Sequence, residues 1–121
     1  MTAAAETGRA GERAATEYLR RAGYEICALN WRQGRYELDI VACREGVLHF
    51  VEVKTRSNTD MGLPREYVTP AKQRRLKKTA LYYLCEKQLD CPARFDVAEV
   101  YADSPYSREN VRIEYLENAF E

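Results

Sequence analysis

Two pairs of charged residues lie on neighbouring segments of the chain that otherwise have the pattern of buried β-strands. Glu37 and Asp39 belong to the first segment, and Glu52 and Lys54 belong to the second. Side chains two residues apart share one face of a strand, so each pair is expected to project together. Charges at such positions are costly to desolvate unless they are paired or bind an ion. If the two strands form a hairpin, the pairs predict a cluster of carboxylates with one ammonium group beside it.

A carboxylate cluster of this kind suits Mg²⁺ or Mn²⁺, which prefer oxygen ligands and water in octahedral geometry. Such a metal could polarise a phosphoryl oxygen and lower the pKa of a bound water. Lys54 could then orient that water or stabilise charge on the phosphate. The alternative is a cross-strand salt bridge on a solvent-facing sheet, which is common. Spacing alone slightly favours the salt bridge.

Glu12 adds a third acidic segment. It precedes Ala15 and Leu19 by three and seven residues, so it falls on or beside the apolar stripe of the first expected helix. From there it could reach over the sheet as another metal or water ligand. Its alternative role is a carboxylate near a helix start that interacts with the helix dipole. That role explains less well why three separate segments bring acid toward one layer.

Hydrophobic periodicity and turn residues predict the elements that position these side chains. The expected order is helix, three strands, helix and two strands, an α/β fold in which either or both of the last strands could lie at a sheet edge. A loop is expected over 57–68, and Thr69 and Pro70 are expected to cap and begin the second helix. Gly23 is expected to close the first helix. The expected helices span about 7–21 and 70–87, and the expected strands span 24–30, 36–42, 47–53, 95–101 and 111–116, with a turn at 44–46 joining the second and third strands.

The net charge is zero, but its distribution is uneven. From Lys54 to Lys78 there are eight basic and two acidic residues, whereas from Asp90 to Glu121 there are three basic and eight acidic residues. A helix rich in lysine and arginine is often only a solvated face, and a neutral total argues against a generic nucleic-acid coat. The basic centre beside a carboxylate cluster nevertheless predicts contact with a polyanion.

The four cysteines and the single histidine do not predict a zinc site. No pair of cysteines has C-x-x-C spacing, and His49 stands alone in an apolar stretch. Cys27 and Cys43 fall inside expected strands, where a free thiol behaves as a small hydrophobe. His49 is expected to be a satisfied core or sheet residue, and structural disulfides are not expected.

Length and composition predict one globular domain spanning residues 1–121. The chain is 45% hydrophobic and 31% charged, with four prolines and six glycines, which is ordinary for a globular protein. No apolar run approaches the roughly 20 residues needed to cross a bilayer. The first six residues lack the basic and apolar regions of a signal peptide, so a cytoplasmic location without membrane contact is expected.

The order and spacing of these residues resemble a known nuclease signature. Asp39, twelve intervening residues and then Glu52-Val53-Lys54 resemble the D…(D/E)-x-K signature of the PD-(D/E)XK nuclease superfamily. A wider pattern is similar to the bacterial YraN family of endonuclease-like proteins, which are related to archaeal Holliday-junction resolvases. That pattern covers the chain from about Gly8 to Val100 and comprises G-x-x-GE-x-x-A-x-x-YL at 8–19, GY at 23–24, ELDIVA at 37–42, FVEVKTR at 50–56, K-x-x-RL at 72–76 and RFDV at 94–97.

The resemblance implies a restriction-endonuclease-like core with a mixed central β-sheet flanked by helices, in the order αβββαββ. It also implies hydrolysis of phosphodiester bonds with Mg²⁺ or Mn²⁺. Asp39 and Glu52 would be the metal carboxylates, with the Val53 carbonyl as a further ligand. Lys54 would be the catalytic lysine, and Glu12 would be the helix glutamate.

Two positions depart from the pattern that the resemblance brings. Tyr36 stands where the family usually has glycine before the Glu-x-Asp motif, and Leu38 stands where the superfamily has proline before the aspartate. Neither change removes a ligand, although Tyr36 could alter access to the strand. Glu37 could be a metal ligand or a group that acts through the ligands.

The basic centre gains a role from this resemblance. Arg56, at the end of the motif strand, and Lys72 and Arg75, one turn apart on the second helix, could line a path for the phosphate backbone. No base-reading motif is present, which favours recognition of shape or junctions, with DNA as the partner and a homodimer suggested by analogy.

Three hypotheses follow from the sequence. The first is an active, structure-selective nuclease, and the second is a nucleic-acid-binding module that keeps the nuclease fold with little or no hydrolysis. The third is an interaction protein whose acidic C-terminal third docks a partner.

Overall fold

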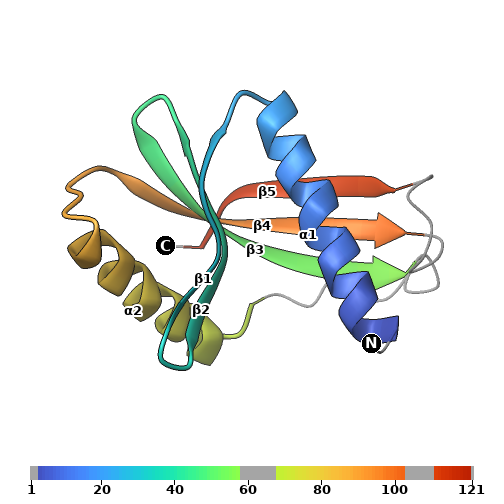
Figure 1. Ribbon diagram of the computed structural model, residues 1–121, viewed down its shortest axis with the longest axis horizontal. Helices are drawn as coiled ribbons and strands as arrows, with labels where there is room; N and C mark the ends of the chain where they lie inside the picture. The colour runs from blue at the N-terminus through green and yellow to red at the C-terminus, as the bar shows by residue number, and fades with distance from the viewer. Residues whose placement is uncertain (1–2, 58–67, 103–110, 121) are drawn as a thin grey trace.

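One five-stranded sheet forms the centre of the molecule, and a helix lies on each of its faces (Figure 1). The computed structural model describes residues 3–57, 68–102 and 111–120. The elements follow the expected order αβββαββ, which is consistent with a restriction-endonuclease-like core. They are α1 (Ala3–Arg21), β1 (Glu25–Gln33), β2 (Tyr36–Arg44), β3 (Val47–Ser57), α2 (Pro70–Glu86), β4 (Ala93–Ala102) and β5 (Arg112–Phe120).

The strands lie side by side in chain order, β1-β2-β3-β4-β5. Neighbouring strands are antiparallel except for β3 and β4, which are parallel. A parallel pair needs a crossover connection, and α2 supplies it. The sheet is therefore mixed, as expected, and β5 but not β4 lies at an edge.

The expected helix signals are confirmed at both helices. Gly23 adopts a φ of 92°, and the Tyr24 amide donates to the Leu19 carbonyl at 2.9 Å, which closes α1. Thr69 caps α2, because its hydroxyl accepts a hydrogen bond from the Lys72 amide at 3.2 Å and Pro70 follows at the first helical position. The start of α1 differs from the expectation, since the helix begins at Ala3 rather than near residue 7.

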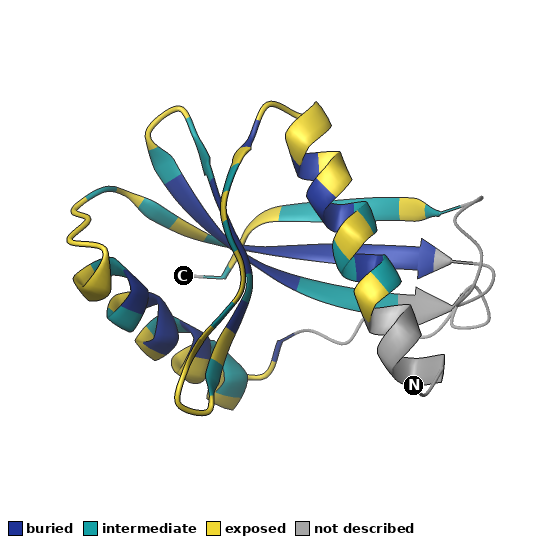
Figure 2. Cartoon of the chain, viewed as in Figure 1, coloured by how far each residue is buried: buried dark blue, intermediate teal, exposed yellow. Residues whose placement is uncertain are grey.

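The core has two halves, one on each face of the sheet, because side chains alternate along the central strands. Figure 2 shows buried positions along the central strands and on both helices. Along β3, Val51 packs on the α1 side, whereas Leu48 and Phe50 pack on the α2 side. The α1 half is built from Ala15, Leu19, Tyr24, Ile40, Ala42, Val51, Ala98 and Val100, and the α2 half from Leu38, Val41, Leu48, Phe50, Val68, Leu76, Ala80, Tyr83 and Val97. Of the stripe expected on α2, Leu76, Ala80 and Tyr83 are buried and Leu84 is half-buried.

Two strands run further than their apolar runs predict. The apolar run of β3 ends at Val53, but the strand continues to Ser57 because each residue from Leu48 onward pairs with β4. β5 continues to Phe120 through a bulge between its pairing with Val97 and its pairing with Phe95. The loop expected over 57–68 lies almost wholly outside the described residues. No helix in the described ranges combines the length and apolar character needed to cross a membrane.

The pairing of β2 with β3 ends early, and this feature positions the candidate site. The two strands pair from Arg44↔Val47 to Ile40↔Val51 and no further. Beyond that point β3 continues alongside β4, whereas the β1–β2 hairpin leaves the sheet direction and runs toward α2 (Figure 1). We call the divergence of β2 and β3 the fork. Asp39 and Glu52 are the first residues beyond the last pair on each strand.

Close packing of α1 on β3 gives the first prediction. A Cβ added at Gly11 would overlap the hydroxyl oxygen of Thr55, so Gly11→Ala is expected to lower the free energy of unfolding by about 1–2 kcal/mol through overpacking. In a Thr55→Ala background the overlap is gone, and the same change should stabilise the protein by up to about 1 kcal/mol because alanine favours helix over glycine. Urea denaturation of the four proteins measures both effects. Equal effects of Gly11→Ala in the two backgrounds would contradict the contact.

Candidate functional site

The Asp39 carboxylate occupies the space between the diverging strands. Its Oδ2 accepts a hydrogen bond from the Val53 amide at 3.0 Å, which replaces the main-chain bond that a continued ladder would supply. The N–H and C=O of one residue point to the same side of an extended strand. The Val53 carbonyl therefore faces the fork as well. The fork thus presents one carboxylate and one main-chain carbonyl in the same place.

Glu52 meets the first turn of α2. Its Oε1 lies 2.6 Å from the Lys72 Nζ, and its side chain is only 10% exposed. Lys72 is brought there by the cap at Thr69, which fixes the start of the helix. The first turn of α2 therefore supplies a cation to the Glu52 carboxylate. Lys54 lies two residues after Glu52 on the same face of β3.

The Glu52 and Glu12 carboxylates both act electrostatically on Asp39. Burial, the Glu52 carboxylate and the Glu12 carboxylate raise the pKa of Asp39 to about 7, although the Val53 amide acts in the opposite direction. Partial burial works against the charged form of Lys72, but Glu52 and Asp39 more than compensate and raise the pKa of its ammonium group. The Asp39 and Glu52 carboxylates therefore share a largely buried space with lysines beside it.

The structure brings together most, but not all, of the residues singled out from the sequence. Glu12 is half-buried on α1 and near enough to act on Asp39. Glu37 is joined to Arg32 on the β1–β2 hairpin, at 3.5 Å, rather than to the Asp39–Glu52 pair. Arg75 is exposed on α2, one turn from Lys72. Arg56 lies on β3, but its side chain is outside the described part of the chain.

Sequence reasoning placed Lys72 on a path for the phosphate backbone and missed its contact with Glu52. A signal was available in the sequence. Thr69-Pro70 fixes the helix start, and Leu76 lies four residues after Lys72 on the buried side of the helix. A lysine in the first turn on that side is within reach of an acidic side chain on the sheet.

A second polar cluster, also missed, lies on the α1 side of the sheet. Asp96 is fully buried, and its Oδ2 lies 2.6 Å from His49 Nδ1 and accepts a hydrogen bond from the Tyr115 hydroxyl. Its Oδ1 accepts the Asn118 amide at 2.8 Å, at the bulge in β5. Burial and Asp96 together raise the pKa of Tyr115. His49 is thus the satisfied core residue that the sequence predicts, and an aspartate inside the apolar strand around Phe95 was the available signal.

Comparison with known proteins places the chain in a family. Residues 11–100 match the profile of the Uncharacterised protein family UPF0102. The chain belongs to the UPF0102 family. It is 49% identical over 113 residues to a UPF0102 protein of Bacteroides fragilis, an alignment that covers 93% of this chain and 90% of that protein. UPF0102 proteins of Bacteroides thetaiotaomicron and Caldicellulosiruptor saccharolyticus are 45% identical over 115 residues and 42% identical over 116 residues, covering 95% of this chain and 92% and 97% of theirs.

The UPF0102 match contains every residue of the fork. It begins at Gly11, which packs against β3, and it extends through β4 to Val100. Glu12, Asp39, Glu52, Lys54 and Lys72 all fall within it, whereas β5 lies outside it.

The donor atoms at the fork of this UPF0102 chain fit a small divalent cation with oxygen ligands. Asp39 and Glu52 are near enough for a hydrogen bond between their carboxyl groups, and the Val53 carbonyl faces the same space. Among the described residues no group of three histidine, cysteine, aspartate or glutamate side chains forms a complete metal cage. Mg²⁺ does not require one, because it commonly binds one or two carboxylates and keeps several waters.

The raised pKa of Asp39 gives the second prediction. In metal-free protein, folding should hold a proton on Asp39 that the unfolded chain releases above its ordinary pKa of 3.8. This stabilisation is fully present below that value and is lost as the pH rises through about 7. Between about pH 4 and pH 8 the free energy of unfolding should fall by roughly 2–4 kcal/mol more in the wild-type protein than in Asp39→Asn. Urea denaturation in EDTA measures this difference, and parallel pH profiles would contradict it.

Proposed function

We propose that the chain is a metal-dependent nuclease that hydrolyses phosphodiester bonds in DNA. The observation that carries this proposal is the fork, where the Asp39 and Glu52 carboxylates and the Val53 carbonyl converge beside Lys54 and Lys72. This is an oxygen donor set for a divalent cation with ammonium groups next to it. Substrates with negatively charged oxygens around a reacting phosphorus match that combination.

Asp39, Glu52 and the Val53 carbonyl would hold Mg²⁺ or Mn²⁺. When bound, the cation supplies charge neutralisation at the phosphate and a water of lowered pKa. The Val53 amide fixes the orientation of the Asp39 carboxylate before any ligand arrives, since it already donates to Oδ2 at 3.0 Å. A pre-oriented ligand loses little conformational freedom on binding.

Lys54 and Lys72 have different electrostatic roles at the fork. Lys54 projects from β3 on the face of Glu52, where it stabilises charge that develops on the phosphate or orients the attacking water. Lys72 neutralises Glu52 before substrate and metal are bound. With Glu52 holding a cation, Lys72 would be available to the phosphate. Glu12, from α1, faces the same carboxylates and can accept a proton or hold a water at the edge of the fork.

The fold and the sequence resemblance support this assignment. The αβββαββ order is consistent with a restriction-endonuclease-like core, and Asp39 with Glu52-Val53-Lys54 resembles the PD-(D/E)XK signature. The similarity to the YraN family and its resolvase relatives favours branched or junction-like DNA over a specific base sequence. A homodimer would suit a substrate with two strands to cut.

A nucleic-acid-binding module without hydrolysis is the second candidate. The 2.6 Å ion pair between Lys72 and Glu52 favours it, because that contact occupies one of the carboxylates. In that case the fork would be a structural site, and the basic residues around it would bind phosphate groups without cutting.

Divalent cations should stabilise the folded protein through the fork. At a concentration a hundredfold above the dissociation constant, Mg²⁺ or Mn²⁺ should add about 2.7 kcal/mol to the free energy of unfolding. Asp39→Ala and Glu52→Gln should abolish the increase in melting temperature that the cation causes. Glu37→Gln is the matched control, because Glu37 pairs with Arg32, and it should keep the increase. Equal responses of all three variants would place the cation elsewhere.

Cleavage of a labelled panel tests the function itself. The panel comprises single-stranded, duplex, flap and four-way DNA together with RNA, each incubated with Mg²⁺ or Mn²⁺. Asp39→Ala and Lys54→Ala should lower the rate at least about a hundredfold, since each removes charge stabilisation at the reacting phosphate. Circular dichroism checks that both variants fold.

The panel also separates the two candidate functions. Metal-dependent cutting that disappears in both variants supports the nuclease, and the best substrate identifies its preferred structure. Folded protein that binds nucleic acid but cuts nothing on the panel would favour the binding module.

A further inference from the structure

The β1–β2 hairpin ends in a tight turn that presents an arginine. Gln33 and Tyr36 are paired, so the loop has only two residues, Gly34 and Arg35. Gly34 has a φ of 60°, which a two-residue hairpin turn with glycine at its first position requires. Arg35 follows and is exposed. Because the turn is short, the direction in which Arg35 leaves the hairpin is well defined.

Aromatic contacts hold this hairpin against α2. The rings of Tyr36 and Tyr82 have centroids 5.6 Å apart, and the Lys78 Nζ lies 5.7 Å from the centre of the Tyr36 ring. Nearer the core, the rings of Trp31 and Tyr83 meet edge to face at 5.3 Å. The hairpin and the helix therefore form one continuous surface. Tyr36 stands at a position where the resembled family usually has glycine. It is one of the residues that hold the hairpin against α2.

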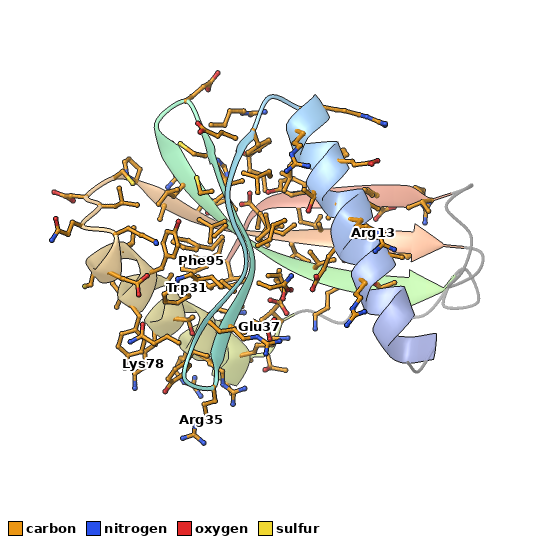
Figure 3. The ribbon with its side chains drawn as sticks, viewed as in Figure 1. Arg13, Trp31, Arg35, Glu37, Lys78 and Phe95 are labelled. Carbon is orange, nitrogen blue, oxygen red and sulfur yellow. The ribbon has the colours of Figure 1, made fainter. Side chains whose placement is uncertain are left out.

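Basic side chains line the junction of hairpin and helix. A helix turns by about 100° per residue, which places Arg75 and Lys78 on the same flank as Tyr82, and Tyr82 faces the hairpin. Arg35 extends the row to the turn of the hairpin. We call this set the basic ridge: Arg35, Arg75 and Lys78. Figure 3 shows Arg35 and Lys78 at the same edge of the molecule, whereas Arg13 lies over α1 on the other side.

The basic ridge begins at Arg75, one turn along α2 from the lysine at the fork. Lys72 contacts Glu52 there, and Lys78 lies six residues further along α2, a rise of about 9 Å. A nucleic-acid strand whose phosphate group reached the fork would therefore have further phosphates in reach of the ridge. All three ridge side chains are exposed, and Glu37 pairs with Arg32 on the opposite face of the hairpin.

The chemistry of the ridge favours a double-stranded segment over a single strand. Single-strand binders usually offer exposed aromatic rings on which bases stack. Here Trp31, Tyr36 and Tyr82 are half-buried, because the hairpin rings pack against the tyrosines of α2. The exposed groups are guanidinium and ammonium groups. Such groups contact phosphates without reading bases, and a duplex presents phosphates while it hides its base faces.

We propose that the basic ridge binds the phosphate backbone of a duplex segment that flanks the phosphodiester at the fork. This inference rests on the proposed function for its ligand, but it concerns binding and does not require hydrolysis. It assigns the β1–β2 hairpin to substrate recognition and makes a duplex arm part of the preferred substrate.

The test compares two double variants by fluorescence anisotropy in EDTA, with a labelled duplex and a single strand of the same sequence. Arg35→Ala/Lys78→Ala should weaken duplex binding roughly tenfold and reduce the slope of log affinity against log salt by about one to two. Arg20→Ala/Arg21→Ala removes the same charge from two exposed positions at the end of α1 and should change duplex binding less than about twofold. Arg35→Gln keeps the contact of Lys78 with Tyr36 and controls for displacement of the hairpin.

Each outcome tests binding by the basic ridge independently of whether the protein cuts DNA. A loss confined to the ridge variants and larger for duplex than for single strand supports the ridge, whether or not the protein cuts DNA. An equal loss in the α1 control shows a general charge effect and overturns it. An equal loss for both nucleic acids overturns the duplex preference, and unchanged binding overturns the ridge itself. Loss of cutting in Asp39→Ala with normal duplex binding would bear on the nuclease proposal alone.

Discussion

The hydrogen bond from the Val53 amide to the Asp39 carboxylate holds the fork open, and the rest of the site depends on it. Where β2 and β3 stop pairing, the amides facing the gap lose their main-chain partners. An unsatisfied buried amide would cost about 1–3 kcal/mol. Asp39 satisfies that amide with its side chain, which allows β2 to turn toward α2. In doing so it places its own charge next to Glu52 and in partial burial, which is why its pKa is raised to about 7.

Asp96, which is buried, and Asp39, which is half-buried, show how surroundings separate a structural acid from one suited to ligand binding. Asp96 is fully buried but has a hydrogen-bonding neighbour for each oxygen, from His49, Tyr115 and the Asn118 amide. Asp39 has one amide donor and two carboxylate neighbours. The first arrangement satisfies a negative charge within the protein. The second leaves charge that a cation can balance.

Local patterns in the sequence were enough to predict the elements, their order, the end of α1 and the start of α2. Gly23, Thr69 and Pro70 act through backbone geometry within a few residues, so their effect can be read from the chain. The convergence of Glu12, Asp39 and Glu52 also followed from strand alternation and helical spacing. The fork could not be predicted, because where β2 leaves β3 is decided by the packing of the hairpin on α2. For the same reason the partners of Glu37 and Lys72 were not evident from spacing alone.

The bulge in β5 has a consequence for assembly of the molecule. An edge strand with an unbroken row of free main-chain groups is a template for pairing with another chain. In β5 that row is disturbed near its C-terminal end, where Asn118 has a φ of 53° and its amide is turned inward to Asp96. A second chain could add a regular ladder only along the part of the edge before the bulge. The hydrogen bond to the buried Asp96 carboxylate thus shortens the part of the β5 edge that can pair with another strand. This limits edge-to-edge association of the sheet with a second chain.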